Sequence, residues 1–347
     1  MKIVIHERKG SFSDRWIDYC KLNNIPFRIV NCYDTDILAQ LRDCDGLMWH
    51  WSHVDYRAQN FARQLILSIE KMGIHVLPSY NTCWHFDDKV GQKYLLEAID
   101  APLVNSYAFY NRKDALKWVQ TTSFPKVFKL RGGAGASNVQ LLKTRNETKK
   151  IIHKAFGKGF KLTDRFSNLK QRIWVLKRDR NIHAVIHFIK GIIRLIVQKP
   201  NLDLLPTQKG YVYFQDFIPG NEYDDRIVVV GNRAFALRRY VRKNDFRASG
   251  SGVFEYNKRL FNEEVVKIAF QISETINAQS LAFDFIYDRH NNPHIVEASY
   301  AYSMGPAYDN CPGYWDRNLN WHEKPVNPQF FIIEDFINSI KNDKKIN

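Results

Sequence analysis

A glycine-rich turn between two short apolar segments constrains this chain more than any other feature. Residues 124–142 read FPKVFKLRGGAGASNVQLL, which predicts strand, turn and strand. The turn lacks the Gly-Lys-Ser/Thr ending of a P-loop and the helix-opening third glycine of a dinucleotide fingerprint. At Gly132, Gly133 and Gly135 the backbone can approach phosphates closely, and Lys129 adds a cation. The stretch therefore predicts a phosphate-covering hairpin, with a flexible surface turn as the alternative.

The composition is that of an ordinary folded protein. The chain has 347 residues, 45% of them hydrophobic and 25% charged, which is enough for two or three domains. Its five cysteines include no Cys-x-x-Cys pair, so they encode neither a disulfide framework nor a zinc site. There is no run of 18 apolar residues, and charges follow the first residues too early for a signal peptide. We expect a cytoplasmic protein with reduced, mostly buried thiols and no transmembrane segment.

The net charge of +15 is unevenly distributed. Between residues 145 and 199 there are 15 Lys and Arg against three acidic residues, so this stretch alone carries 15 − 3 = +12. Such an excess predicts an anionic partner: a polyphosphate, an acidic glycan, nucleic acid or a membrane surface. The alternative is a solvated face beside the phosphate site. A nucleic-acid partner is disfavoured, because the chain has no recognition motif of that class.

The N-terminal region predicts a small parallel sheet. Short apolar strands alternate with helical segments, at residues 2–5, 27–31 and 46–49. Ligands of such sheets lie beyond the carboxyl ends of the strands, so residues 7–14 and 49–53 are expected to help hold a substrate. A helix follows, with Lys89 in its first turn. A cation there opposes the helix dipole, and its position is unfavourable unless an anion faces it.

Two blocks in the second half carry clustered charges on predicted strands. Six arginines lie between residues 226 and 247, just after Glu222 and two aspartates. Guanidinium groups bind phosphates and carboxylates in pairs of hydrogen bonds, but Arg238 and Arg239 are neighbours on a strand and cannot both face one site. Further on, Asp284 and Glu297 lie on two paired apolar strands, where a metal would offset their burial. Magnesium is the natural candidate, with an ion-paired structural role as the alternative.

Four segments in this order carry a family resemblance. They are FPKVFKLRGGAGASNV, QDFIPGNEYDDRIVVVG, NDFRASGSG and AFDFIYDRHNNPHIVEAS. Together they resemble the ATP-grasp superfamily, and more narrowly the branch with glutathione synthetase and the ribosomal-protein glutamate ligases. The resemblance covers roughly residues 89–340. It implies an α/β (α+β) chain with an ATP-grasp fold and an N-terminal αβα pre-ATP-grasp domain. The implied domains are 1–88, a lid subdomain 89–212 with a basic insertion at about 145–200, and a C-terminal subdomain 213–347.

The resemblance also implies roles for individual residues, with ATP and Mg²⁺ as cofactors. Residues expected at the nucleotide are Lys89, Lys129, Gly132, Gly133, Gly135, Ser137, Gln215, Asp216, Phe217, Ile218 and Glu222. The metal ligands would be Asp284, Glu297 and Ser299, and the catalytic cations Arg226, Arg239 (or Arg238) and Arg247. Two positions depart from the family pattern. Ser299 stands where an asparagine is usual, and Ala248 and Ser249 stand where an asparagine is expected after Arg247.

The activity implied is ATP-dependent joining of a carboxylate to an amine through an acyl phosphate. The basic lid and the aromatic segment 303–325 suit an acidic, sugar-linked carboxylate, such as a uronic acid in a glycan. The alternatives are a ligase that adds amino acids to peptide or protein tails, and a non-catalytic relative that binds an anionic polymer. The partners expected are therefore a small or glycan-linked carboxylate, an amine, and an anionic molecule at the lid. A homodimer is compatible with this interpretation.

Overall fold

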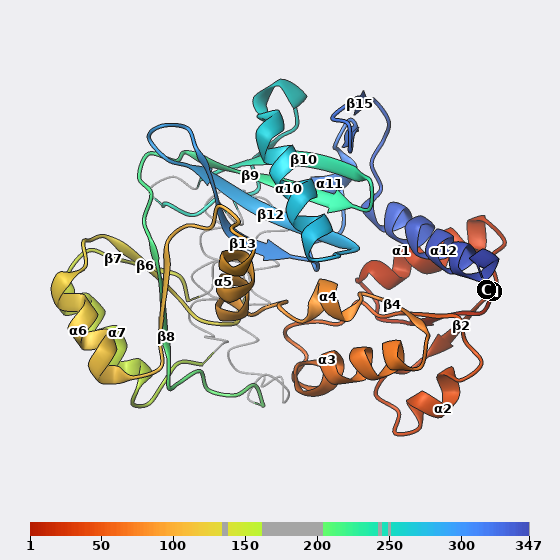
Figure 1. Ribbon diagram of the computed structural model, residues 1–347, viewed down its shortest axis with the longest axis horizontal. Coiled ribbons are helices and arrows are strands. Elements are labelled where there is room, and N and C mark those ends of the chain that lie inside the picture. The colour runs from red at the N-terminus through yellow and green to blue at the C-terminus, as the bar shows by residue number, and fades with distance from the viewer. Residues whose placement is uncertain (134–137, 162–203, 242–244, 249–250, 347) are drawn as a thin grey trace, which may run out of the picture. The chain divides into compact units, whose positions relative to one another are not determined.

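The computed structural model describes residues 1–133, 138–161, 204–241, 245–248 and 251–346 (Figure 1). Gly135, Ser137 and most of the predicted basic insertion therefore lie outside the described residues. The chain divides into two compact units. Unit 1 contains residues 1–52, 57–104 and 218–347, and unit 2 contains residues 53–56 and 105–217. The three-domain division expected from the sequence stays a prediction.

The N-terminal part of unit 1 is the predicted parallel sheet. Its strands are β1 (Ile3–His6), β2 (Phe27–Val30), β3 (Gly46–Met48) and β4 (His75–Leu77), in the order β2-β1-β3-β4. The connecting helices are α1 (Phe12–Leu22), α2 (Ile37–Leu41) and α3 (Tyr56–Lys71). All pairings are parallel, as short apolar strands that alternate with helices predict. All five cysteines are buried and unbridged, as expected.

A larger antiparallel sheet forms the rest of unit 1. Its order is β13-β12-β9-β10-β14-β15, and β11 also pairs with β10. The strands are β9 (Tyr223–Val230), β10 (Arg233–Tyr240), β11 (Phe254–Glu255), β12 (Ser280–Tyr287), β13 (Pro293–Ser299), β14 (Tyr314–Asp316) and β15 (Trp321–His322). The helical elements of this part of the chain are α4 (Tyr80–Cys83), α5 (Lys89–Ala98), η1 (Lys258–Leu260), α10 (Glu263–Thr275), α11 (Pro306–Asp309) and α12 (Pro328–Ile346).

Alternation along the strands gives this sheet two apolar faces. Ile227 and Val229 of β9 join the core that contains Val265 of α10. Val228 and Val230 join a second core that contains residues of α1 and α12. Helices α1 and α12 lie side by side (Figure 1). Both faces of the central strands are therefore buried over most of their length, and a charged side chain there requires a partner.

Unit 2 is a four-stranded antiparallel sheet with two helices on one face. The sheet order is β5-β8-β6-β7, with β5 (Ser106–Phe109), β6 (Lys126–Lys129), β7 (Gln140–Leu142) and β8 (Val212–Asp216). The helices are α6 (Arg112–Thr121) and α7 (Arg145–Ala155), which pack together over the sheet. The pairing of β6 with β7 confirms the strand–turn–strand arrangement predicted around the glycines. Helix α7 begins with a capping box between Thr144 and Glu147. Among the described residues, no helix is both long and apolar enough to cross a membrane.

One buried histidine makes the stability of unit 1 sensitive to pH. His85, between α4 and α5, is 1% exposed, and its ring nitrogens have no hydrogen-bond partner among the described residues. Burial lowers the pKa of His85 from 6.5 to about 4. The unfolded chain therefore binds a proton below pH 6.5 that the native protein does not bind until about pH 4. Stability should fall over this interval as the pH falls, by up to about 3 kcal/mol from this group.

We expect His85→Phe to remove this part of the acid sensitivity. Urea unfolding at pH 7.5 and at about pH 4.5 would measure it, as the difference in unfolding free energy between the two conditions. The difference should be smaller in His85→Phe than in the wild type. His153→Gln, at an exposed position of α7, is the control and should behave as the wild type does. An unchanged pH dependence in His85→Phe would show that His85 does not carry this sensitivity.

Candidate functional site

Two arginines and two aspartates form a buried cluster on one face of the large sheet. Arg226 of β9 donates to both oxygens of Asp284 on β12, at 2.6 and 2.8 Å. Arg239 of β10 donates to both oxygens of Asp224, at 2.6 and 2.7 Å, and lies 2.8 Å from Asp284 Oδ2. The register brings these residues together, because Arg226 is opposite Asp284 and Asp224 is opposite Arg239. The four residues were dispersed in the sequence, and strand pairing makes them one site.

The neighbouring arginine points the other way. Arg238 donates to both oxygens of Asp225, at 2.8 and 2.9 Å, and to the carbonyl of Leu260. Tyr287 also donates to Asp225, at 2.6 Å. These contacts lie on the opposite face of the sheet from Asp284, as strand alternation predicts. Of the two arginines considered from the sequence, only Arg239 therefore lies in the cluster with Arg226.

The cluster separates the pKa values of its two carboxyl groups. Burial alone would raise the pKa of Asp284, but Arg226 and Arg239 outweigh burial and hold it well below its usual range. Burial raises the pKa of Asp224, to about 6, and its single arginine partner compensates only in part. Asp284 therefore stays ionised over the physiological range and fixes both guanidinium groups in charged, oriented positions.

Glu297 lies beside this cluster and faces a buried lysine. It is directly opposite Asp284 in the pairing of β13 with β12. Its Oε1 atom is 3.1 Å from Nζ of Lys89, the first residue of α5. Burial lowers the pKa of Lys89, but Glu297 and the nearby Asp87 and Asp88 outweigh this and shift it upward. An anion does face this helix N-terminus, which accounts for a lysine there. Three cations (Lys89, Arg226 and Arg239) and three carboxylates (Asp224, Asp284 and Glu297) thus lie next to one another on this face of the sheet.

The predicted metal ligands lie together, and their chemistry suits magnesium. Asp284, Glu297 and Ser299 share one face of the β12–β13 pair, and Ser299 Oγ donates to the carbonyl of Ala301 at 3.4 Å. The described residues contain no group of three or more His, Cys, Asp or Glu able to hold an ion. Two adjacent carboxylates are nevertheless what Mg²⁺ takes when phosphates and water complete its shell. The residues therefore fit a metal that arrives with a nucleotide better than an all-protein metal cage.

The residues expected at the nucleotide in unit 2 occupy one sheet face and its edge. Phe128 belongs to the core under the helices, so the adjacent Lys129 lies on the opposite face. Gln215, 2% exposed, donates to Ser106 Oγ at 3.1 Å. Gly132 is buried, and Gly133 has φ 107°, a conformation that favours glycine. Gly135 and Ser137 are not among the described residues.

The other predicted residues are placed within their own units. In unit 2 the Asp216 side chain forms a salt bridge with Lys126, and Phe217 follows the strand. In unit 1 Ile218 precedes β9, and the exposed Glu222 accepts a backbone hydrogen bond from Val241. Their contacts with a nucleotide stay predictions.

Arg247 pairs locally rather than with the buried cluster. Its Nε and Nη2 atoms donate to Asp245, with 2.6 Å between Nη2 and Oδ2. The Arg247 side chain is 31% exposed. Its predicted place beside the transferred phosphate therefore stays a prediction, unlike the geometric grouping of Arg226 and Arg239.

Sequence reasoning missed a tyrosine that contacts the cluster. Arg226 Nη1 donates to the Tyr308 hydroxyl at 3.0 Å, and Tyr308 is 2% exposed. The next residue, Asp309, accepts two 2.6 Å bonds from Arg15 of α1. Tyr308 therefore connects helix α11 to β9, and the adjacent Asp309 connects it to α1. The only sequence signal was the richness of aromatic residues in segment 303–325, which did not single out Tyr308.

The two predicted ligand loops of the parallel sheet do come together. Arg8, after β1, donates to the carbonyl of His50, after β3, at 3.2 Å. The backbone N–H of Phe12 donates to His50 Nδ1, and the Phe12 and His50 rings stack with centroids 3.9 Å apart. This arrangement sets a guanidinium group beside the N-terminus of α1, at the edge where such sheets bind ligands.

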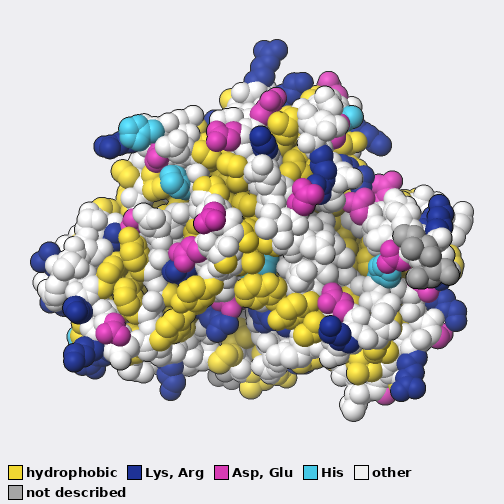
Figure 2. Space-filling model, in the orientation of Figure 1, with side chains coloured by type: hydrophobic (Ala, Val, Ile, Leu, Met, Phe, Trp, Pro, Cys, Tyr) yellow, Lys and Arg dark blue, Asp and Glu magenta, His cyan; other side chains and the backbone are white. Residues whose placement is uncertain are grey.

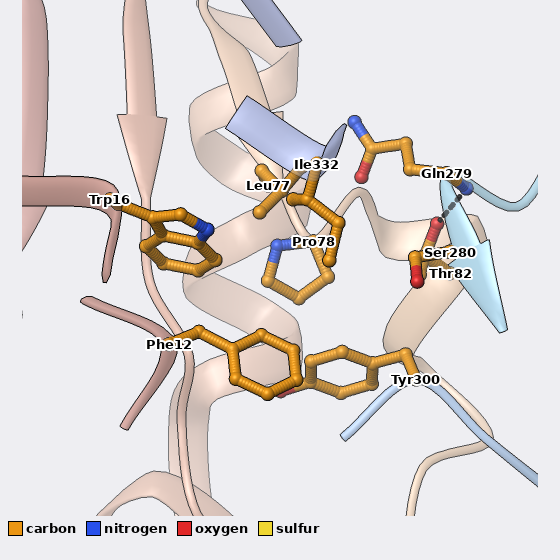
Figure 3. A pocket seen from close by; sticks show the side chains of 9 residues that line it. All are labelled: Phe12, Trp16, Leu77, Pro78, Thr82, Gln279, Ser280, Tyr300 and Ile332. Carbon is orange, nitrogen blue, oxygen red and sulfur yellow. Dashed lines mark hydrogen bonds between the residues drawn. The ribbon is translucent and has the colours of Figure 1, made fainter. Parts of the chain in front are cut away.

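A small cavity beneath these loops is too narrow for a substrate. Figure 3 shows its lining, with the rings of Phe12, Trp16 and Tyr300 turned toward Pro78. Its volume is about 10 Å³, near the lower limit for one water molecule. The cavity is therefore a packing feature of the core.

We expect Tyr308→Phe to destabilise the protein by about 2 kcal/mol, because it removes a hydrogen bond to a buried charged group. Tyr302→Phe is a matched control, since Tyr302 is also buried but shares its hydrogen bond with the neutral hydroxyl of Ser280. That change should cost about 1 kcal/mol. Urea unfolding of both variants measures the difference. Equal losses would show that the bond to Arg226 has no special strength.

Comparisons with known proteins agree with this architecture. Residues 193–304 match the model of the RimK-like ATP-grasp domain. D-alanine–D-alanine ligase from Bacillus anthracis complexed with ATP superposes with a TM-score of 0.57 at 12% identity, and the match covers 99% of each chain. The D-cycloserine synthetase DcsG gives a TM-score of 0.56 at 10% identity, covering 97% of this chain and 99% of that one.

A RimK-domain ATP-grasp protein from Sphaerobacter thermophilus is similar at a TM-score of 0.50 and 12% identity, covering 86% of this chain and 90% of that one. None of the curated proteins compared matches the sequence significantly. At these identities the structural matches establish the fold, and the domain match supports the same assignment from sequence. The chain therefore has the ATP-grasp fold, and its residues 193–304 match an ATP-grasp domain of the RimK-like type.

Proposed function

We propose that the protein is an ATP-dependent carboxylate–amine ligase. In the proposed reaction the γ-phosphoryl group of ATP passes to a carboxylate oxygen, which gives an acyl phosphate and ADP. An amine then attacks the acyl carbon, the bond to phosphate breaks, and an amide and inorganic phosphate form. The nitrogen loses a proton in this step. The observation that carries the proposal is the buried cluster of Arg226, Arg239 and Asp284 beside Glu297, on the large sheet of an ATP-grasp fold.

The cluster suits phosphoryl transfer because its cations are charged and held in place. Positioning and charge neutralisation carry most of the catalysis of such reactions. Asp284 orients both guanidinium groups through direct contacts, so they need little reorganisation when negative charge accumulates on nearby oxygens. Bound Mg²⁺ would add Lewis-acid charge at Asp284 and Glu297. Lys129, on the face of the unit 2 sheet opposite its helices, would supply a further cation to the nucleotide phosphates.

We propose an acidic, sugar-linked carboxylate as the acyl substrate. Arg8 is set beside the α1 N-terminus, where the guanidinium group and the positive end of the helix dipole can attract a carboxylate by charge. Two aromatic side chains of segment 303–325 are half-buried: Tyr314, which stacks on His322, and Trp321, which packs edge to face on the buried Trp315. Flat aromatic surfaces suit the apolar faces of sugar rings. A preference for neutral, free amino acids on both sides of the bond would contradict this choice and favour a peptide-type ligase.

Calorimetric titration with a non-hydrolysable ATP analogue and Mg²⁺ tests the nucleotide site. We expect binding to the wild type and a large loss of affinity in Lys129→Ala. ADP release with a panel of uronic acids and amines then tests the reaction. No nucleotide binding to the wild type would contradict the ligase and leave the non-catalytic alternative.

We expect Arg226→Lys to reduce turnover by about 10²–10³-fold, since a lysine cannot reproduce the paired hydrogen bonds of the guanidinium group. Nucleotide affinity should change little in comparison, and circular dichroism should show a folded protein. Arg233→Lys, on β10 but paired with Asp335, is the matched control and should retain most of its activity. Equal effects of the two changes would indicate a structural role for Arg226.

We expect Mg²⁺ alone to bind weakly, and Mg²⁺ with the ATP analogue to bind well. Asp224, Asp284 and Glu297 are balanced by Lys89, Arg226 and Arg239, so this face offers no net negative charge to a free dication. The phosphates of the nucleotide supply the negative charge that Mg²⁺ needs. The shift in melting temperature with Mg²⁺, with the analogue and with both together measures these bindings. Micromolar binding of Mg²⁺ alone would show that the charge balance is not decisive.

A further inference from the structure

The two helices of unit 2 carry a dense group of exposed cations. We call this group the basic surface. All of its members are exposed on α6, on α7 or just beside α7: Arg112, Lys113, Lys117, Lys143, Arg145, Lys150, Lys154, Lys158 and Lys161. Figure 2 shows dark-blue side chains over the region of α6 and α7. Since α6 and α7 pack against each other, charges that are distant in sequence lie on one surface.

The charge of this surface is almost uncompensated. Only Asp114 and Glu147 are acidic within the two helices, so the surface carries about 9 − 2 = +7. The Glu147 carboxylate accepts from the backbone N–H groups of Lys143 and Thr144 and is engaged at the start of α7. None of the nine cations is ion-paired with an acidic side chain in the described part of the chain. Like charges this close repel one another, and an anion bound across them would relieve the repulsion.

The basic surface is not the rim of the candidate nucleotide site. The helices pack through Ala115 and Ile152 onto the sheet face that holds Phe128 and Phe214. Lys129 follows Phe128 on β6 and therefore lies on the opposite face. The sheet separates Lys129 from the cations on α6 and α7, so their charge is not explained as a solvated face beside bound ATP. Lys161 is different, because its carbonyl accepts a hydrogen bond from Asn138 Nδ2, directly after the glycine-rich turn.

The side chains of this surface suit a hydrophilic polymer with many negative charges. Seven of the nine cations are lysines, which act as point charges and demand little geometry from a partner. Neither helix exposes a large apolar or aromatic side chain among those described, although Tyr110 just before α6 is 58% exposed. Stacking of single-stranded bases uses aromatic platforms, and amphipathic membrane anchors insert apolar side chains. Both kinds of partner would be poorly served here.

We propose that the basic surface binds an acidic polysaccharide. The choice of polymer rests on the proposed function, because a glycan-linked carboxylate as substrate implies that an acidic glycan is the protein's natural partner. Binding through many weak, exposed ion pairs gives modest affinity that falls steeply as salt increases. The surface would thereby keep the protein on the polymer between successive reactions.

Fluorescence anisotropy of labelled polygalacturonate with the full-length protein tests the proposal. We expect Lys117→Glu/Lys150→Glu/Lys158→Glu to lower the affinity at least about tenfold, because three charge reversals on one surface each remove an attraction and add a repulsion. The matched control is Lys267→Glu/Lys324→Glu/Lys341→Glu, at exposed positions of unit 1 with the same change in net charge. It should stay within about twofold of the wild type.

The outcomes separate this proposal from the proposed function. The proposal would be overturned by equal losses of affinity in the two triple variants or by no binding of polygalacturonate to the wild type. It would also be overturned if the protein bound duplex DNA, or vesicles containing phosphatidylglycerol, more tightly than polygalacturonate. Titration with the ATP analogue runs in parallel. Polymer binding that requires the basic surface, in a protein that fails to bind the analogue, would support the surface and overturn the ligase. Binding of the ATP analogue without binding of the polymer would support the nucleotide site of the ligase and overturn the proposed role of the basic surface.

Discussion

The buried ion pairs among Arg226, Arg239, Asp224 and Asp284 depend on the register of three antiparallel strands, and much of unit 1 depends on the same register. A buried charge is costly unless it is paired at hydrogen-bonding distance. A slip of β9 by one residue would turn Arg226 toward the core under α10 and bring Ile227 to the other face. The apolar and the charged side chains of β9 therefore select the same register.

The same cluster explains how a highly charged site can be preorganised. Asp284 accepts hydrogen bonds from two guanidinium groups, and its neighbour Glu297 faces Lys89. Each cation already has an oriented partner, so an incoming anion meets fixed charges rather than mobile side chains. Tyr308 adds a neutral hydroxyl to Arg226, and the pair of Arg15 with Asp309 holds the helix that carries it. These contacts extend the support of the site to α1, far away in the sequence.

The two electrostatic regions of the protein are built differently. On the large sheet, cations and carboxylates are buried and balanced, which favours specific orientation. On α6 and α7 the cations are exposed and unbalanced, which favours long-range attraction that salt screens. The buried, balanced arrangement on the large sheet suits a reaction at one bound chemical group. The exposed, unbalanced arrangement on α6 and α7 suits the retention of a charged polymer.

The sequence by itself determined the local elements and the fold class. The pattern around the glycine-rich turn and the alternating N-terminal strands predicted the β6–β7 hairpin and the parallel sheet, because these signals are periodic and local. The ATP-grasp fold was predicted from the resemblance of four ordered segments to that superfamily. Alternation also showed that Arg238 and Arg239 face opposite ways. Only the tertiary structure decided which charges meet. The pairing of Arg226 with Asp284, of Lys89 with Glu297 and of Tyr308 with Arg226 joins residues 58, 208 and 82 positions apart. Such contacts follow from strand register and helix packing, which depend on the whole core rather than on any one segment.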